Sequence, residues 1–343
     1  MLSKFKLYLV ISMVLFVSSM TGVSASAVTL KIATVSPEGA TWMVKMREGA
    51  SEIEQRTQGR VKFKFYSGGV MGSDDSVLRK IKIGQLHGGA VTGGSLIDIY
   101  PELMIYSLPF VFQSFEEVDI VREQMDALLT HGLEERGFVS FGLAEGGFAY
   151  LMSNHRVEST HDLKNQKVWV MSGDRLSQTI FESASVSPVL LPISDVMTGL
   201  QTGLVDTVAT SPIAAIALQW HTKVKYVTDA PLSYFFAMLA VSKKMFDKIQ
   251  PDDQVIVKQV MASTFEKINA QNRVDNENAR VALEKQGLQF VKLSSETLQG
   301  WKQTAHQAIE RFTRENTLDT GLLNKINEVL AAYRKSKSSV ATK

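Results

Sequence analysis

Apolar and polar side chains alternate in two segments near the start of the chain. Residues 28–32 and 61–65 each show this alternation, which is the pattern of a half-buried β-strand. Between them, Trp42, Met46 and Ile53 recur at helical spacing, which is typical of an amphipathic helix. A strand, a helix and a strand in this order predict an α/β domain with a largely parallel sheet.

The same alternation of elements starts again downstream. Residues 167–171 and 189–191 read as strands, and residues 174–185 between them read as a helix. We therefore expect a second α/β unit between about Phe148 and Tyr234, since its length and pattern match those of a small domain.

A long uninterrupted helix is predicted after the second unit. Pro251 stands at its start, Gly287 lies just beyond its end, and neither residue type occurs in between. A continuous helix over this segment would be about 50 Å long at 1.5 Å per residue. That length exceeds the size of one small domain, so the helix should run along two lobes and brace both.

These elements predict a two-lobed α/β protein with a cleft between the lobes and strands that cross from one lobe to the other. The expected division of the chain is lobe I at residues 28–147 and 235–275, lobe II at residues 148–234 and 276–335, and a flexible tail at residues 336–343. The tail is separated because it lacks apolar periodicity.

The N-terminus has the features of a secretory signal peptide over residues 1–27. Lys4 and Lys6 precede an apolar stretch from Leu7 to Val17, and Ala25-Ser26-Ala27 fits an A-x-A cleavage site. The stretch is short for a membrane span, which needs roughly 20 apolar residues. We therefore expect a protein exported to the periplasm.

Composition excludes several classes of site. The chain has 37 basic residues, 35 acidic residues and no cysteine, which excludes disulfides and cysteine-based metal sites. Its basic residues form no stripe of the kind that nucleic-acid binding requires. The six histidines are dispersed, and the metalloprotease, phosphate-loop, dinucleotide and nucleophile-elbow motifs are absent. The sequence thus predicts a hinged binding protein rather than an enzyme, without a metal or cofactor.

Several short motifs, in a fixed order, then identify a family resemblance. From about Leu30 to Phe312 the chain resembles the periplasmic solute-binding subunits of tripartite ATP-independent periplasmic (TRAP) transporters. The resemblance is carried by Met71-Gly72-Ser73, Ile83-Gly84-Gln85-Leu86, Leu108-Pro109-Phe110, Asp162-Leu163-Lys164, Lys167–Met171 and Leu200–Asp206. It implies two α/β lobes around a ligand cleft, a small-molecule solute, membrane permease subunits as partners, and a monomer.

The chain departs from this family at three polar positions that hold the ligand. The arginine of the family pattern K-[IV]-R-V is replaced by Trp169, and the arginine of a G-x-R-like segment by Ala149. The asparagine that follows the family's V-D-G-Q-E pattern is replaced by Thr210. An indole offers one hydrogen-bond donor and no charge, so Trp169 cannot form the two parallel bonds of an arginine–carboxylate pair.

Three classes of ligand therefore remain open. An organic acid, which family precedent slightly favours, would need a relocated cation, and Arg175 is the nearest candidate. A neutral or aromatic solute would lie against Trp169, with Phe148 and Tyr150 nearby.

A cationic solute would pair with Glu38 or Asp174 and stack on Trp169. Further ligand contacts are expected from Thr92, Ser95, Trp220 and Phe235. In each case the expected function is capture of a solute and its delivery to a TRAP-type permease. The alternatives are a periplasmic ligand-sensing adaptor and a periplasmic enzyme that uses the same cleft.

Overall fold

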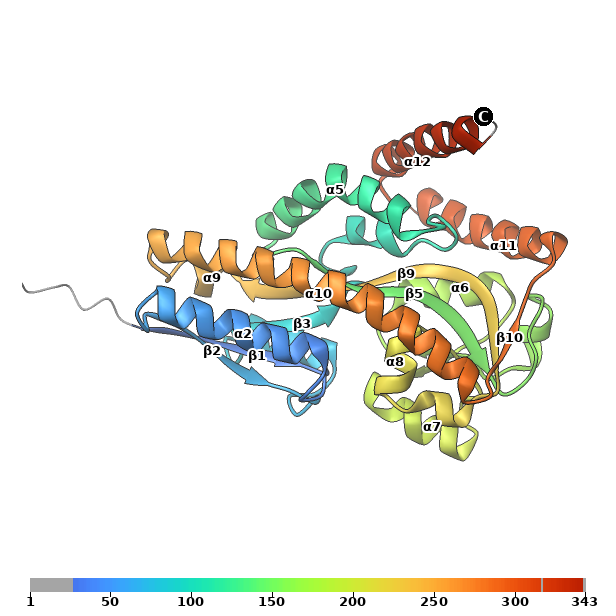
Figure 1. The fold of residues 1–343 in the computed structure, drawn as a ribbon, viewed down its shortest axis with the longest axis horizontal. Coiled ribbons are helices and arrows are strands. Elements are labelled where there is room, and N and C mark those ends of the chain that lie inside the picture. Colours follow the sequence, from blue (N-terminus) through green and yellow to red (C-terminus); the bar gives the residue numbers. More distant parts are fainter. Residues whose placement is uncertain (1–26, 316, 342–343) are drawn as a thin grey trace, which may run out of the picture.

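The computed structural model describes residues 27–315 and 317–341. The expected signal peptide lies outside the described residues apart from Ala27. The described chain forms two α/β lobes that share one eight-stranded sheet (Figure 1). The main order of its strands is β2 (Val61–Tyr66), β1 (Val28–Thr34), β3 (Gly88–Thr92), β9 (Tyr226–Ser242), β5 (Leu143–Ser153) and β8 (Thr207–Thr210). Within these residues, no helix combines the length and the apolarity that a bilayer span requires.

The first lobe begins with three parallel strands and the helices that connect them. These elements are β1 (Val28–Thr34), α2 (Thr41–Arg56), β2 (Val61–Tyr66), α3 (Asp74–Lys82) and β3 (Gly88–Thr92). The predicted alternation places Leu30 and Ile32 in the core, where both are fully buried. The lobe continues through the short helix α4 (Gly93–Leu96), a 3-10 helix (Pro101–Ser107), α5 (Phe115–Glu135) and β4 (Phe138–Val139).

Two long strands connect the lobes. Strand β5 (Leu143–Ser153) runs from the first lobe into the second, and β9 (Tyr226–Ser242) runs back beside it (Figure 1). Because β9 runs in the opposite direction, it pairs antiparallel with β3, β4 and β5. The sheet is therefore mixed, and the prediction of a largely parallel sheet is wrong at these strands.

The second lobe places a small sheet and several helices beside the crossing strands. Its elements are β6 (Trp169–Met171), α6 (Arg175–Ser183), β7 (Val189–Leu191), α7 (Val196–Thr202), β8 (Thr207–Thr210), α8 (Pro212–Ala217) and β10 (Gln289–Val291), with 3-10 helices at Asp162–Asn165, Ile193–Asp195 and Trp220–Lys223. Strand β6 pairs parallel with β7. Strand β8 pairs antiparallel with β5, which joins this lobe to the shared sheet.

Helix α10 (Pro251–Lys285) braces both lobes, as its length predicted (Figure 1). It follows the short helix α9 (Lys243–Phe246). Val257 and Met261 are buried in the core of the first lobe, whereas Leu283 is buried with Trp220 in the second. The helix therefore shares apolar contacts with both ends of the crossing strands.

The C-terminal helices divide between the lobes. Helix α11 (Ser295–Arg314) packs on α6, and α12 (Thr320–Ala341) packs on α5. Ile326 and Leu330 are buried in the core of the first lobe, and the Arg334 Nε donates to Glu117 Oε1 at 2.8 Å. Residues 320–335 therefore pack with lobe I rather than with lobe II, where the sequence placed them.

The prediction of a flexible tail at residues 336–343 is also corrected, because helix α12 continues to Ala341. The last two residues lie outside the described part of the chain.

Candidate ligand-binding site

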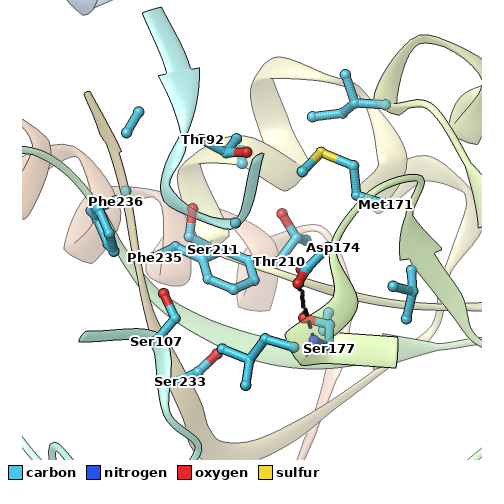
Figure 2. A pocket seen from close by; sticks show the side chains of 18 of the residues that line it. Thr92, Ser107, Met171, Asp174, Ser177, Thr210, Ser211, Ser233, Phe235 and Phe236 are labelled. Atoms are coloured by element: carbon cyan, nitrogen blue, oxygen red, sulfur yellow. Dashed lines mark hydrogen bonds between the residues drawn. The ribbon is translucent and has the colours of Figure 1, made fainter. Parts of the chain in front are cut away.

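A cavity of about 310 Å³ lies between the two lobes. It is lined by the β3–α4 turn of the first lobe, by β6, α6, β8 and α8 of the second, by the crossing strands and by α10. Figure 2 shows Asp174, Ser177 and Thr210 of the second lobe around the same space as Thr92 of the first. Binding there would contact both lobes at once.

Aromatic side chains form much of the wall. The rings of Trp169 and Trp220 are arranged edge to face with their centroids 5.1 Å apart. The Trp169 Nε1–H donates to the Leu191 carbonyl oxygen at 3.0 Å, so its one donor is already used within the protein. Phe235 and Phe236 contribute further rings from β9. This wall offers apolar surface to a ligand and no charge.

Asp174 caps the N-terminus of α6 and lines the cavity. Its carboxylate accepts the Ser177 N–H at 3.0 Å and the Ser177 hydroxyl at 2.6 Å. Burial raises the pKa of Asp174, and the two bonds from Ser177 act against that rise. A Cβ at Gly94 would stand 3.2 Å from Asp174 Cγ, so the absence of a side chain there lets the first lobe approach the carboxylate closely.

A second carboxylate, Glu145, borders the cavity but is fully engaged. It is 2% exposed. It accepts hydrogen bonds from Arg122 at 2.8 Å and from Arg273 at 2.7 Å. The bonds of Arg273 to Asp119 and Glu145 raise the pKa of that arginine above its ordinary value. The two arginines closest to Glu145 are therefore already paired with carboxylates.

No lysine, arginine or histidine occurs among the described residues that line the cavity. Its other polar groups are uncharged, and they include Ser107, Thr210, Ser211, Ser233 and Asn272. The part of the chain that the structure describes also contains no cluster of three or more histidines and carboxylates that could hold a metal ion.

Six of the side chains that the sequence analysis singled out line the cavity: Thr92, Trp169, Asp174, Thr210, Trp220 and Phe235. Thr92 and Thr210 end strands, and Asp174 and Trp220 lie at the starts of helices. Trp169 begins β6, whereas Phe235 lies in the middle of the crossing strand β9. Of the positions taken from the family pattern, Thr92, Trp169 and Thr210 meet at the cavity, and Ala149 does not.

Two candidate charged residues lie outside the cavity. The Arg175 side chain is 75% exposed and lies 3.9 Å from Asp98. Capping by Asp174 fixes the first turn of α6, and the next residue then projects outward. Glu38 lies on the outer surface, where its carboxylate accepts hydrogen bonds from Arg47 and Ser67.

The remaining four candidates belong to the protein interior rather than to the cavity wall. Phe148 packs on Phe115 at 5.1 Å between ring centroids, and Ala149 is fully buried. Tyr150 lies beneath the Arg280 guanidinium, at 5.8 Å. Ser95 donates to the buried Asp74 carboxylate at 2.9 Å. Strand β5 meets the cavity earlier in its course, at residues 144–146.

Several lining residues escaped the sequence analysis. Ser177 was detectable, because a serine three residues after an aspartate cap is placed to donate to it. Ser211 follows the selected Thr210 directly. Ser107, Glu145 and Asn272 carry no local signal, since they reach the cavity only through the packing of distant segments.

A comparison with known families agrees with this geometry. The model of the family "Bacterial extracellular solute-binding protein, family 7" matches residues 32–316. The chain belongs to this family. Family 7 proteins are periplasmic receptors that bind small solutes and work with membrane permease components; they are solute-binding proteins rather than enzymes.

Individual family 7 relatives are distant in sequence but close in fold. The C4-dicarboxylate-binding periplasmic protein DctP of Rhodobacter capsulatus is 22% identical over 75% of this chain and 79% of its own length. The sugar-acid-binding protein of Advenella mimigardefordensis, in complex with galactonate, has a TM-score of 0.82 at 17% identity and covers 90% of this chain and 99% of its own. A TRAP periplasmic solute-binding protein of Haemophilus influenzae with bound L-gulonate has a TM-score of 0.81 at 19% identity, with coverage of 88% and 99%.

Proposed function

We propose that the mature protein, released by cleavage near Ala27, is a monomeric periplasmic subunit that captures one solute between its lobes and presents it to a TRAP-type permease. The cavity supports this role because it is lined by both lobes. A ligand that touches both lobes stabilises the closed form, and only such differential contacts shift the equilibrium between open and closed states.

We further propose that the solute presents a hydrogen-bond donor to Asp174 and an apolar body to the aromatic wall. The observation that carries this proposal is the charge of the lining. Asp174 and Glu145 are its charged residues among the described ones, and Glu145 is already paired with two arginines. A hydroxyl, an amide N–H or an ammonium group would each satisfy the Asp174 carboxylate.

This proposal departs from the organic acids that solved relatives bind. The similar protein from Advenella mimigardefordensis binds galactonate, and the one from Haemophilus influenzae binds L-gulonate. Both ligands carry a carboxylate. In the present cavity a carboxylate would face Asp174 without a basic partner, and an unpaired buried charge is strongly unfavourable. A neutral or cationic head group avoids that cost.

A matched set of small ligands tests the head group. Thermal unfolding of the protein from Val28 onward would be measured with 4-methylbenzyl alcohol, 4-methylbenzylamine and 4-methylbenzoate, which share one ring and differ in charge. Ligand at 100 times its Kd stabilises by about 2.7 kcal/mol. We expect the alcohol or the amine to raise the melting temperature and the benzoate to leave it unchanged.

The isosteric variant Asp174→Asn distinguishes the two head groups that the proposal allows, a neutral hydrogen-bond donor and a cation. If the ligand is cationic, this variant should lose amine binding; if the ligand is a neutral donor, it should retain alcohol binding through the remaining amide oxygen. A shift caused by the benzoate alone would contradict the proposed ligand chemistry.

Two other roles for the same cleft are distinguished by separate measurements. An enzyme would convert the bound ligand, so recovery of unchanged ligand after prolonged incubation supports simple capture. A sensing adaptor would co-purify with a receptor domain, whereas a transport subunit should interact with permease subunits in its ligand-bound form.

A further inference from the structure

A second cavity, of about 60 Å³, adjoins the main one. The partition between them is formed by the five residues that line both cavities: Ser177, Phe181, Ala209, Ser233 and Phe235. Its far wall comes from α11, through Trp301 and Ala305. Since α11 lines the small cavity and not the large one, the small cavity extends away from the cleft toward the C-terminal helices.

The small cavity is apolar. Its described lining contains no charged residue. The polar groups of its wall are largely used within the protein. The Trp301 Nε1–H donates to the Glu158 carbonyl oxygen at 3.0 Å, and the Thr304 hydroxyl donates to the Gly300 carbonyl oxygen at 3.1 Å. A small cavity with such a lining holds water poorly and accepts apolar groups.

The backbone is strained where it forms one side of this cavity. Phe110 has a φ of +57°, a left-handed conformation that is rare for a bulky residue. Its N–H donates to the Leu232 carbonyl oxygen at 2.7 Å, and both residues line the cavity. Strain of this kind is concentrated at ligand-binding sites, where the surrounding structure maintains it.

We infer that the small cavity is a subsite for a short aliphatic end of the solute whose head group lies in the main cavity. One water molecule takes up about 30 Å³ of liquid, so this space suits an end of roughly two to three carbons and excludes a ring. Phe181 and Phe235, which line both cavities, would contact the solute where it passes from one to the other. The inference rests on the proposed function for the position of the head group.

A homologous series tests the subsite. Dissociation constants would be measured by calorimetry for 4-methyl-, 4-ethyl-, 4-propyl- and 4-butylbenzyl alcohol, and for the corresponding benzylamines. Burial of each added methylene should lower Kd about fourfold until the cavity is full. We expect this gain in affinity per methylene to have stopped when the chain reaches butyl. A methyl parent that binds as tightly as its longer relatives would overturn the subsite and leave the proposed function intact.

Variants on α11 provide the structural test. Ala305→Leu should fill the cavity, remove the gain from chain length and leave the Kd of the methyl compound within about twofold. The control Gln303→Leu adds the same side chain at an exposed position of the same helix and should retain the gain. If Ala305→Leu fails to fold, Thr304→Leu adds volume to the same wall. A gain that persists in a filled variant would overturn the inference.

Two measurements separate this inference from the proposed head group. If only 4-methylbenzoate binds, the proposed head group is wrong, and the 4-alkylbenzoates then take the place of the alcohols with the same variants. If no member of any series binds, crystal structures determined under xenon pressure would show whether the small cavity accepts an apolar atom. Xenon beside Trp301 in the native protein, and its loss in Ala305→Leu, would support the subsite, whereas no xenon there in the native protein would overturn it.

Discussion

Trp169 stands edge to face against Trp220, with ring planes 77° apart, while its indole N–H is bonded to the Leu191 carbonyl oxygen at 3.0 Å. The family resemblance predicts an arginine at this position, where it would pair with the carboxylate of a ligand. In this chain the position has become part of an apolar wall, because both the ring and its one donor are used within the second lobe. The position therefore contributes a packed aromatic pair and no charge to the cavity wall.

Replacement of Trp169 should reveal how much the pair contributes to stability. Trp169→Ala should lower the free energy of unfolding by about 3–5 kcal/mol, because it leaves a void beside Trp220. Trp169→Phe keeps an aromatic ring and loses the bond to Leu191, so its loss should be smaller, about 1–3 kcal/mol. Urea unfolding of the three proteins provides the measurement. Equal losses for both variants would show that the hydrogen bond, and not the packing, is decisive.

Asp174 should make stability depend on pH in an unusual direction. Its folded pKa is raised above the ordinary value by burial, against the bonds from Ser177. Between the unfolded value of about 3.9 and the raised value, the folded protein binds more protons than the unfolded chain. The contribution of Asp174 to the free energy of unfolding is therefore fully present below the unfolded pKa and declines as pH rises through this window.

Asp174→Asn removes this titration, so the variant should gain stability relative to the native protein as the pH is raised above about 3.9. Urea midpoints of both proteins from pH 3.5 to 7.5 would show the trend. Comparison of the two proteins cancels the contribution of Asp74, whose pKa is also raised by burial. A difference that does not change with pH would contradict the assignment.

Glu145→Gln should release positive charge next to the cavity. Arg122 and Arg273 would each lose a carboxylate partner, and loss of one member of a buried ion pair costs about 3 kcal/mol. We expect the variant to be less stable and to begin to bind 4-methylbenzoate. Asp119→Asn is the matched control, since it also removes a partner of Arg273 but at a half-exposed position. Calorimetry that detects benzoate binding in neither variant would show that the arginines cannot reach the cavity.

Gly147 should tolerate no side chain at the point where β5 passes between the lobes. It has a φ of +88°, and a Cβ there would stand 2.7 Å from Asn276 Nδ2 on α10. Gly147→Ala should lower the free energy of unfolding by more than about 1 kcal/mol. Gly300→Ala is the matched control, because Gly300 lies inside α11 with no atom within 4 Å of a Cβ. That control should be stabilising by about 1 kcal/mol, and urea unfolding measures both.

Arg175→Ala should leave ligand affinity unchanged within about twofold. Both Arg175 and its partner Asp98 are largely exposed, at 75% and 68%, and such pairs contribute about 0–1 kcal/mol. The hypothesis that Arg175 replaces the missing clamp predicts instead that the variant loses the ligand-induced thermal shift. Loss of the shift would therefore show that Arg175 turns into the cavity when the ligand binds.

Local patterns in the sequence were sufficient to predict much of the fold. Period-2 alternation placed β1 and β2 correctly, and the segment from Pro251 to Gly287 identified α10, because Pro and Gly mark the ends of helices for steric reasons. The family pattern selected Trp169 and Thr210, and the search for a partner of a cationic solute selected Asp174; all three line the cavity. These are features that a residue and its near neighbours determine.

Only the tertiary structure decided which charged side chains line the cavity. Arg175 follows Asp174 directly, yet helix capping turns one toward the cavity and leaves the other in solvent. Glu145 lines the cavity with its charge already paired, because Arg122 on α5 and Arg273 on α10 converge on it. The small cavity beside Trp301 likewise depends on how α11 packs on α6. Contacts between separate segments leave no periodic trace in the sequence, whether the residues are 23 positions apart, as for Arg122 and Glu145, or 128, as for Arg273 and Glu145. Such contacts set the charge and shape of this cavity.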